Sequence, residues 1–185
     1  VVVQRGGLIE SAHRVHVAVV NEKGEIIAKV GDPHRVVFCR SAAKPFQAVP
    51  LVEEHILDEF GINPNELAVI CASHSGEPKH IEAVRSILDK IGLCEKDLEC
   101  GPHPPFRESA AIELYTNRKE IGPIYNNCSG KHAGFLSVAR HLNAGPEYTD
   151  PNHPVQLMVM DVFQELTQNK VDGIVIDGCS APNPG

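Results

Sequence analysis

The sequence has 185 residues, of which 42% are hydrophobic and 22% charged, and this balance excludes disordered and collagen-like chains. Its 17 lysines and arginines against 24 aspartates and glutamates give a net charge of −7, with no basic run, so we expect no nucleic-acid partner. No apolar run reaches the roughly 18–20 residues of a membrane span, and the first residues lack the pattern of a signal peptide. We therefore expect a soluble, cytoplasmic protein that acts on a small molecule.

The first part of the chain predicts strands followed by a helix. Residues 15–20 and 25–30 are rich in apolar side chains, and a polar, glycine-ended turn joins them, which indicates a β-hairpin. Residues 35–38 predict a third short strand. A helix is expected over residues 41–59, with Pro50 kinking or shortening it.

The rest of the chain predicts two strands and several helices. Residues 67–72 are a continuous apolar run that is too short for a helix of its own, so they predict a buried strand. An amphipathic helix follows Pro78 and ends at Gly92. Three further helices are expected at residues 108–119, 135–142 and 154–168, and a last strand is expected at residues 173–177. Together these elements predict a mixed α and β fold in which helices cover a sheet.

Ser41 and Lys44 have the spacing Ser-x-x-Lys at the expected start of a helix. Residues three apart share a helix face, so Lys44 is expected to reach the Ser41 hydroxyl. A lysine kept neutral by burial can remove that proton and make the serine a nucleophile for acyl transfer. The alternative is an exposed serine and lysine without a chemical role.

Ser73 and His74 follow the apolar run at residues 67–72. One interpretation is a second hydroxyl and backbone donors that line a pocket, with His74 as a base. The alternative is a helix cap and turn with a solvated histidine.

Cys128, Lys131 and His132 lie at positions i, i+3 and i+4 of an expected helix, and Cys179 lies in a second glycine-bounded turn. Thiolate and imidazole groups suit zinc, so the residues by themselves nominate Cys128, His132, Cys179 and, less firmly, Asp177 as ligands. Two unrelated thiols are the alternative, because the sequence has no Cys-x-x-Cys pair.

A series of motifs in fixed order resembles the rhizobial-type L-asparaginase family, also called class 3 or asparaginase II. The motifs are Arg5-Gly6-Gly7 with Glu10-Ser11, Arg40-Ser41-Ala42-Ala43-Lys44-Pro45-Phe46-Gln47, Ala72-Ser73-His74-Ser75-Gly76-Glu77, Cys100-Gly101, Asn126-Asn127-Cys128-Ser129-Gly130-Lys131-His132-Ala133-Gly134, His153-Pro154 with Gln156, and Asp177-Gly178-Cys179. The resemblance implies a fold similar to serine β-lactamases and glutaminases, a homodimer, and hydrolysis of L-asparagine to L-aspartate and ammonia. It also implies that residues 1–185 are a single domain, the N-terminal portion of the family's longer chain.

The resemblance assigns roles to individual residues of the site. It implies that Ser41 is the nucleophile, that Lys44 belongs to the same Ser-Lys tandem, and that Ser73 is the serine of a second tandem whose lysine is expected beyond residue 185. A zinc ion is expected as cofactor, with Cys128, Lys131 and Cys179 as its ligands in place of the His132 that the residues alone suggest.

Three further residues are expected in the substrate pocket by the same resemblance. Arg40 is expected to bind the substrate carboxylate and Asp177 its ammonium group, with His132 close by. Two other functions stay open at this point. One is a glutaminase or another Ser-Lys acyl hydrolase, and the other is an inactive, zinc-bearing fragment that binds amino acids.

Overall fold

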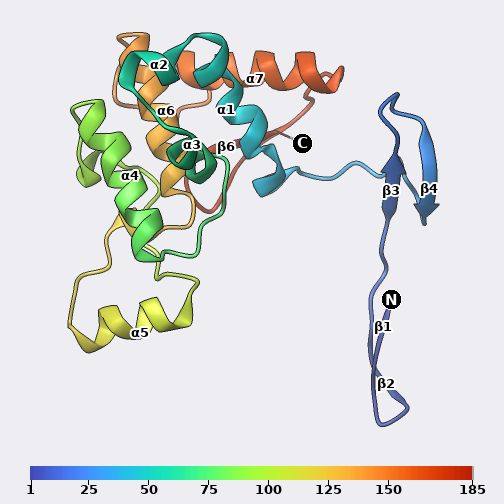
Figure 1. The fold of residues 1–185 in the computed structure, drawn as a ribbon. Helices are drawn as coiled ribbons and strands as arrows, with labels where there is room; N and C mark the ends of the chain where they lie inside the picture. The colour runs from blue at the N-terminus through green and yellow to red at the C-terminus, as the bar shows by residue number, and fades with distance from the viewer. Residues whose placement is uncertain (185) are drawn as a thin grey trace. The chain divides into compact units, whose positions relative to one another are not determined.

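The computed structural model describes residues 1–184. The chain forms two compact units, Val1–Val37 and Phe38–Gly185 (Figure 1). That residues 1–185 form a single domain therefore stays a prediction.

The first unit consists of two antiparallel hairpins. In one, β3 (Val17–Val20) pairs with β4 (Ile26–Val30), which confirms the hairpin expected there. The other, β1 (Val2–Arg5) with β2 (Leu8–Ala12), was not predicted. Its connection is a Gly-Gly pair, and both glycines have positive φ, as two-residue hairpin turns of type I′ require. The strand expected at residues 35–38 is wrong, because that segment forms no strand in the structure.

The second unit is mainly helical, and one helix runs through its core (Figure 1). Its elements are η1 (Arg40–Ala43), α1 (Lys44–Glu53), α2 (Ile56–Phe60), α3 (Pro64–Ile70), α4 (Pro78–Lys90), η2 (Glu95–Asp97), α5 (Glu108–Thr116), η3 (Pro123–Tyr125), α6 (Ser129–His141), α7 (Pro154–Thr167), β5 (Ile174–Ile176) and β6 (Pro182–Pro184). Helix α6 contacts α1, α3, α4 and α7, and its residues from Ser129 to Ala139 are all buried. The start of this helix is therefore held from several sides.

Two glycines allow α6 to approach its neighbours this closely. A Cβ atom on Gly130 would lie 2.4 Å from the carbonyl oxygen of Val69, and one on Gly134 would lie 2.8 Å from the Ile70 side chain. Both neighbours belong to α3, so the small residues at positions 130 and 134 bring the two helix backbones together. This contact fixes the end of α3 relative to the beginning of α6.

The helices expected after Pro78, near residues 108–119, at 135–142 and at 154–168 are confirmed as α4, α5, α6 and α7. The helix expected over residues 41–59 is divided instead. Its first turn is the 3₁₀ helix η1, α1 continues past Pro50 to Glu53, and His55 with φ of +57° separates α1 from α2.

The strand predicted at residues 67–72 is wrong, because most of this run belongs to helix α3. The Asn63 side chain accepts hydrogen bonds from the backbone N–H groups of Asn65 and Glu66, and the Glu66 carboxylate accepts from the Asn63 N–H. Pro64 occupies the first helical position. These residues form a capping box, which starts the helix three residues before the apolar run.

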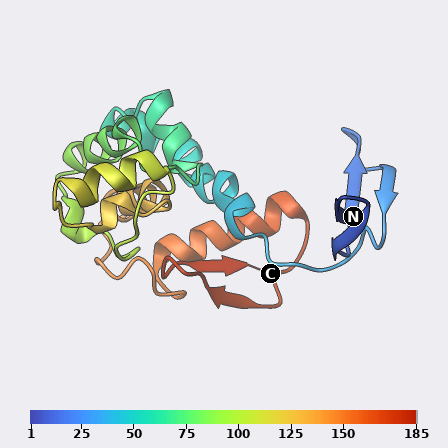
Figure 2. The ribbon, with the colours of Figure 1, turned by 90° about the horizontal axis from the view of Figure 1, so that it is seen from below.

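The strands of the structure form three separate two-stranded antiparallel sheets. β5 lies within the segment 173–177 where a last strand was expected, and it pairs with β6 (Figure 2). The predicted mixture of α and β structure is thereby confirmed in general terms. Within residues 1–184, no helix is long and apolar enough to cross a membrane.

Candidate active site

Three of the residues predicted to be catalytic form one hydrogen-bonded chain. The Lys44 ammonium nitrogen lies 2.9 Å from the Ser73 hydroxyl, and the Ser73 hydroxyl lies 3.0 Å from that of Ser41. Ser41 comes from η1, Lys44 is the first residue of α1, and Ser73 lies in the loop after α3. Two of them are neighbours along the chain, while Ser73 is brought to them by the packing of α3.

Lys44 differs from the sequence-based expectation in its direct partner. The Ser-x-x-Lys spacing predicted that its amine would reach Ser41, but its two hydrogen bonds go to the Ser73 hydroxyl and to the Ala72 carbonyl oxygen at 2.8 Å. Ser73 therefore bridges the lysine and the first serine. A proton that leaves Ser41 has a path to Lys44 through this second hydroxyl.

The surroundings of Lys44 favour its neutral form. The side chain is only 2% exposed, and both of its hydrogen-bond partners are uncharged. Burial lowers the pKa of Lys44 most, the positive charge of Lys131 lowers it further, and the sulfurs of Cys128 and Cys179 oppose this shift without reversing it. A lysine with a lowered pKa is able to act as a general base.

A hollow of about 220 Å³ lies beside Ser41 and collects several predicted site residues. It is lined by Arg40, Ser41, His103, Phe106, Asn126, Asn127, Cys128, Asp177, Gly178 and Cys179. Lys44, Ser73 and Ser41 together form what we call the hydroxyl–amine chain. Lys44 and Ser73 do not line the hollow, so Ser41 is the member of this chain that faces it. The hollow thus places one hydroxyl, one cationic group and one carboxylate around a volume suited to a small polar molecule.

The backbone around the hollow is unusual at Arg40. This residue has φ of +49°, in the left-handed region that non-glycine residues rarely adopt. Its N–H donates to the side-chain oxygen of Asn183 at 3.1 Å, and Asn183 is buried. Strained residues of this kind concentrate at functional sites, because the surrounding structure must hold them in place.

Asp177 and Cys179 reach the hollow from the turn between β5 and β6. The Asp177 N–H donates to the Ala181 carbonyl oxygen at 2.9 Å, and the Ser180 N–H donates to the Asp177 carbonyl oxygen at 2.9 Å. One carboxylate oxygen of Asp177 accepts from the Gly178 N–H at 2.7 Å. The turn is therefore closed by its own backbone, and the second carboxylate oxygen is left for another partner.

Cys128 and Cys179 are both buried, and each shifts the pKa of the other. The interaction with Cys128 lowers the pKa of Cys179, and the same interaction together with burial raises the pKa of Cys128. The Lys131 amine lies 3.1 Å from the Cys179 sulfur, and Lys131 is buried. The position of Cys128 is fixed by Asn126, whose side-chain oxygen accepts from the Cys128 N–H at 2.9 Å.

The donor set of this cluster fits the zinc ion that the resemblance implies. Two converging sulfurs, one of them readily deprotonated, are donors that zinc prefers, and the Lys131 amine is within reach as a third. In residues 1–184, no group of three His, Cys, Asp or Glu side chains is placed to hold a metal ion. A zinc ion held by three donors of this cluster would therefore need the Lys131 amine in its unprotonated form.

His132 is fully buried and does not line the hollow. Its Nδ1 lies 3.0 Å from the Tyr148 hydroxyl, which itself accepts from the Glu99 N–H at 2.7 Å. The phenol oxygen can donate its proton to Nδ1 or accept a second hydrogen bond from it, so this contact allows either neutral tautomer of the ring. Burial lowers the pKa of His132 and keeps the ring neutral. Among the described residues its Nε2 is buried without a hydrogen-bond partner, and the choice of His132 as a ligand, made from the residues alone, stays a prediction.

His74 occupies a place that neither sequence interpretation described. It is neither solvated nor free to act as a base, because it is 3% exposed and both ring nitrogens are within hydrogen-bond distance of a partner. Tyr148 and Asn183 were also missed. All three are polar residues whose partners lie far away in the sequence or across a turn, so spacing gives no signal for them.

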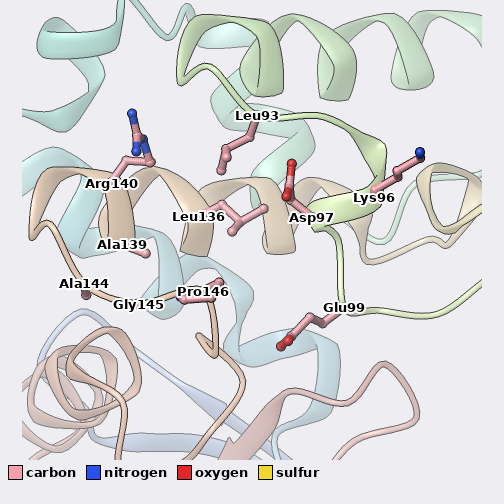
Figure 3. Close-up of a pocket in the computed structure, with 10 residues that line it drawn as sticks. All are labelled: Leu93, Lys96, Asp97, Glu99, Leu136, Ala139, Arg140, Ala144, Gly145 and Pro146. Carbon is pink, nitrogen blue, oxygen red and sulfur yellow. The ribbon is translucent and has the colours of Figure 1, made fainter.

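A second hollow of about 350 Å³ lies between α6, η2 with its flanking residues, and the loop after α6 (Figure 3). Its walls combine the apolar side chains of Leu93, Leu136 and Pro146 with charged groups such as Lys96 and Arg140. None of the predicted site residues lines it, and it contains no nucleophilic side chain. The chemistry of the site therefore belongs to the hollow beside Ser41.

Comparison with known proteins agrees with the resemblance in the sequence. Residues 1–185 match the family described as L-asparaginase II. No individual curated protein matches the chain. The family match spans every residue that builds the hollow and the hydroxyl–amine chain.

Proposed function

Because the chain belongs to the L-asparaginase II family, we propose that it hydrolyses the side-chain amide of L-asparagine to L-aspartate and ammonia through an ester on Ser41. The observation that carries this proposal is the chain from Lys44 through Ser73 to Ser41, which ends at a hollow lined by Arg40 and Asp177. The family supports an asparaginase-type amidohydrolase in general, and the Ser-Lys route is our proposal.

The charged groups of the hollow suit an amino acid. The guanidinium of Arg40 can bind a carboxylate through two parallel hydrogen bonds, and the free carboxylate oxygen of Asp177 can accept from an ammonium group. These two groups would hold the α-carboxylate and α-ammonium of asparagine. The side-chain amide is then directed toward Ser41.

The reaction begins when Ser41 loses its proton through Ser73 to neutral Lys44. The Ser41 oxygen attacks the amide carbon and forms a tetrahedral intermediate, whose oxyanion is stabilised by backbone N–H groups. The C–N bond breaks as the proton returns from Lys44 through Ser73 to the leaving nitrogen, which departs as ammonia. Water then attacks the β-aspartyl ester and gives a proton to Lys44 by the same path. As the bond between the ester carbon and the Ser41 oxygen breaks, this proton returns through Ser73 to Ser41, so that L-aspartate is released and Lys44 is neutral again.

Zinc would be held by Cys128, Lys131 and Cys179 beside this reaction centre. When bound, it supplies a fixed positive charge and a Lewis acid at the edge of the hollow. Asn126 orients the Cys128 backbone, and Lys131 lies against the Cys179 sulfur. Both contacts prepare the cluster, so the protein positions its own donors.

The resemblance extends the proposal to the whole protein. We propose a fold similar to serine β-lactamases and glutaminases, with residues 1–185 as part of one asparaginase II-type domain, and assembly as a homodimer. The cytoplasmic location stays a prediction from the sequence.

Ammonia release from L-asparagine, measured with zinc present and thiols reduced, tests the proposal. Ser41→Ala should abolish release, while Ser109→Ala, at an exposed position of α5, should leave it unchanged. Turnover of L-glutamine and of a chromogenic β-lactam, measured in parallel, separates the asparaginase from other Ser-Lys acyl hydrolases. Near-normal release by Ser41→Ala would overturn the assignment of the nucleophile. Binding of asparagine without any release would favour an amino-acid-binding protein.

A further inference from the structure

His74 connects two segments that approach the site from different parts of the fold. It directly follows Ser73, and its backbone N–H donates to the Asn127 carbonyl oxygen at 3.1 Å. Its imidazole Nε2 lies 2.8 Å from the hydroxyl of Ser129. Asn127 and Ser129 flank Cys128, so this one residue ties the Ser73 loop to the turn that begins α6.

The hydrogen bonds around the ring determine where its proton lies. The Gly76 N–H donates to Nδ1 at 3.2 Å, so Nδ1 must carry a lone pair. The Ser129 hydroxyl donates to the Ile124 carbonyl oxygen at 2.8 Å, so it must accept from the ring. Only the neutral tautomer with its proton on Nε2 satisfies both partners.

The loop that carries His74 is also held from its other side. Gly76 has φ of +76°, and a Cβ atom there would lie 2.6 Å from Pro105. The Ser75 carbonyl oxygen accepts from the Arg107 N–H at 2.9 Å. Residues 74–76 are thus clamped between the α6 turn and the segment before α5.

We propose that His74 is a positioning residue for the hydrolysis proposed above, on which this inference rests: by binding Ser129 it holds Ser73 between Lys44 and Ser41. It does not line the hollow, and both its nitrogens are engaged, so it touches neither the substrate nor the reacting atoms. Its effect reaches the reaction through Ser73, whose hydroxyl must stay within hydrogen-bond distance of two partners at once.

The charge state of the ring agrees with this role. Burial above all, together with the charges of His80 and Lys44, lowers the pKa of His74 to about 4. The ring therefore stays neutral near neutral pH, where a second ring proton would break the bond from Gly76.

The test uses substitutions that keep one of the two ring contacts. His74→Gln places an amide N–H near the position of Nε2 and retains the bond to Ser129, whereas His74→Asn places an oxygen near Nδ1 and retains the bond from Gly76. We expect His74→Ala and His74→Asn to lower kcat by about 10- to 100-fold while KM changes by less than about threefold, because misplacement acts on the chemical step. His74→Gln should stay within about fivefold of the parent in kcat.

Two controls separate positioning from folding. His80→Ala changes the neighbouring histidine at the start of α4 and should leave kcat within about twofold, and urea unfolding of each variant reports stability separately. Ser129→Ala should lower kcat like His74→Asn, and the double variant should be no worse than either single one. Nitrogen-15 NMR of the parent should show His74 with its proton on Nε2.

The outcomes distinguish this inference from the proposed function. A parent chain without ammonia release overturns both. A parent that is active while folded His74→Ala matches it, or His74→Asn that outperforms His74→Gln, overturns the role of His74 alone. A ring protonated on Nδ1 in the NMR spectrum would also contradict it.

Discussion

Two lysines in the helical unit have similar numbers of hydrogen bonds but different kinds of partner. Lys90, at the end of α4, donates to both carboxylate oxygens of Glu66 at 2.7 and 2.6 Å and to the Gly61 carbonyl oxygen at 2.7 Å. Lys44, at the start of α1, donates to the Ala72 carbonyl oxygen and the Ser73 hydroxyl.

This difference separates a structural lysine from a candidate general base. Lys90 forms an ion pair with the Glu66 carboxylate, and this pair holds α3 to α4. Lys44 is more deeply buried and has no carboxylate among its hydrogen-bond partners, so burial can lower its pKa. The same residue type thus acts as a fixed charge at one junction and as a candidate base at the other.

Removing the amine at position 44 should have the largest effect on activity. Lys44→Met is expected to lower kcat by about 10²- to 10⁴-fold, because the general base is lost. Lys44→Arg should be equally impaired, since a guanidinium stays protonated. Steady-state kinetics measure both, and the parent kcat/KM should rise with pH toward the lowered pKa of Lys44. A fully active Lys44→Arg would show that the lysine acts only as a cation.

Changing the thiol pair should act first on metal binding. Cys179→Ser and Cys128→Ser are expected to weaken zinc binding by at least about 100-fold, because a thiolate donor is lost. Metal content after dialysis at fixed free zinc measures this, with Cys94→Ser, at an exposed thiol, as the matched control. Zinc retained by both cluster variants would place the metal elsewhere.

Removing Lys90 should cost stability and spare the reaction. Lys90→Met leaves the Glu66 carboxylate buried without its cation, and we expect the free energy of unfolding to fall by about 3 kcal/mol. Urea unfolding measures the change. The double variant with Glu66→Gln should recover part of the loss, since no charge then stays buried. Ammonia release per folded molecule should remain within about twofold of the parent, because neither residue lines the hollow. A large loss of kcat would contradict the comparison of the two lysines, because Lys90 would then also be needed for the reaction.

Acid should also weaken the contact between Glu66 and Lys90, and this is the smallest of the effects that we expect. Burial raises the pKa of Glu66, but hydrogen bonds from Lys90, from the Ser86 side chain and from the Asn63 N–H outweigh it, so the net pKa is lowered. The contribution to stability is therefore present above the unfolded-state pKa of about 4.3 and is lost as pH falls through the lower folded-state value. Unfolding free energies of the parent and of Glu66→Gln should converge in acid. Curves that stay parallel would contradict the assignment.

The sequence predicts the helices better than the short strands, for local reasons. Helix α4 follows directly from the spacing of its apolar face. The error at residues 67–72 arose from treating the apolar run alone, although the capping box at Asn63 and Glu66 is visible in the sequence and indicates a helix. The Gly6-Gly7 turn of the first hairpin was a similar unused signal.

The structure brings several of the predicted site residues together, but the sequence could not predict the contacts between them. Ser41 and Lys44 are local, so their spacing identified them. The contact between Lys44 and Ser73 joins residues 29 positions apart and depends on the close packing of α3 on α6. The sequence around His74 gives no signal for its contacts, because its side-chain partner Ser129 lies 55 positions away.

Trapping the covalent intermediate tests the central claim most directly. The chain is mixed with L-asparagine, quenched in acid within milliseconds to seconds, digested and analysed by mass spectrometry. The account predicts a β-aspartyl ester on the peptide that carries Ser41, and none in Ser41→Ala. An ester on Ser73, or ammonia release without any ester at Ser41, would contradict the assignment of Ser73 as the bridge and Ser41 as the nucleophile.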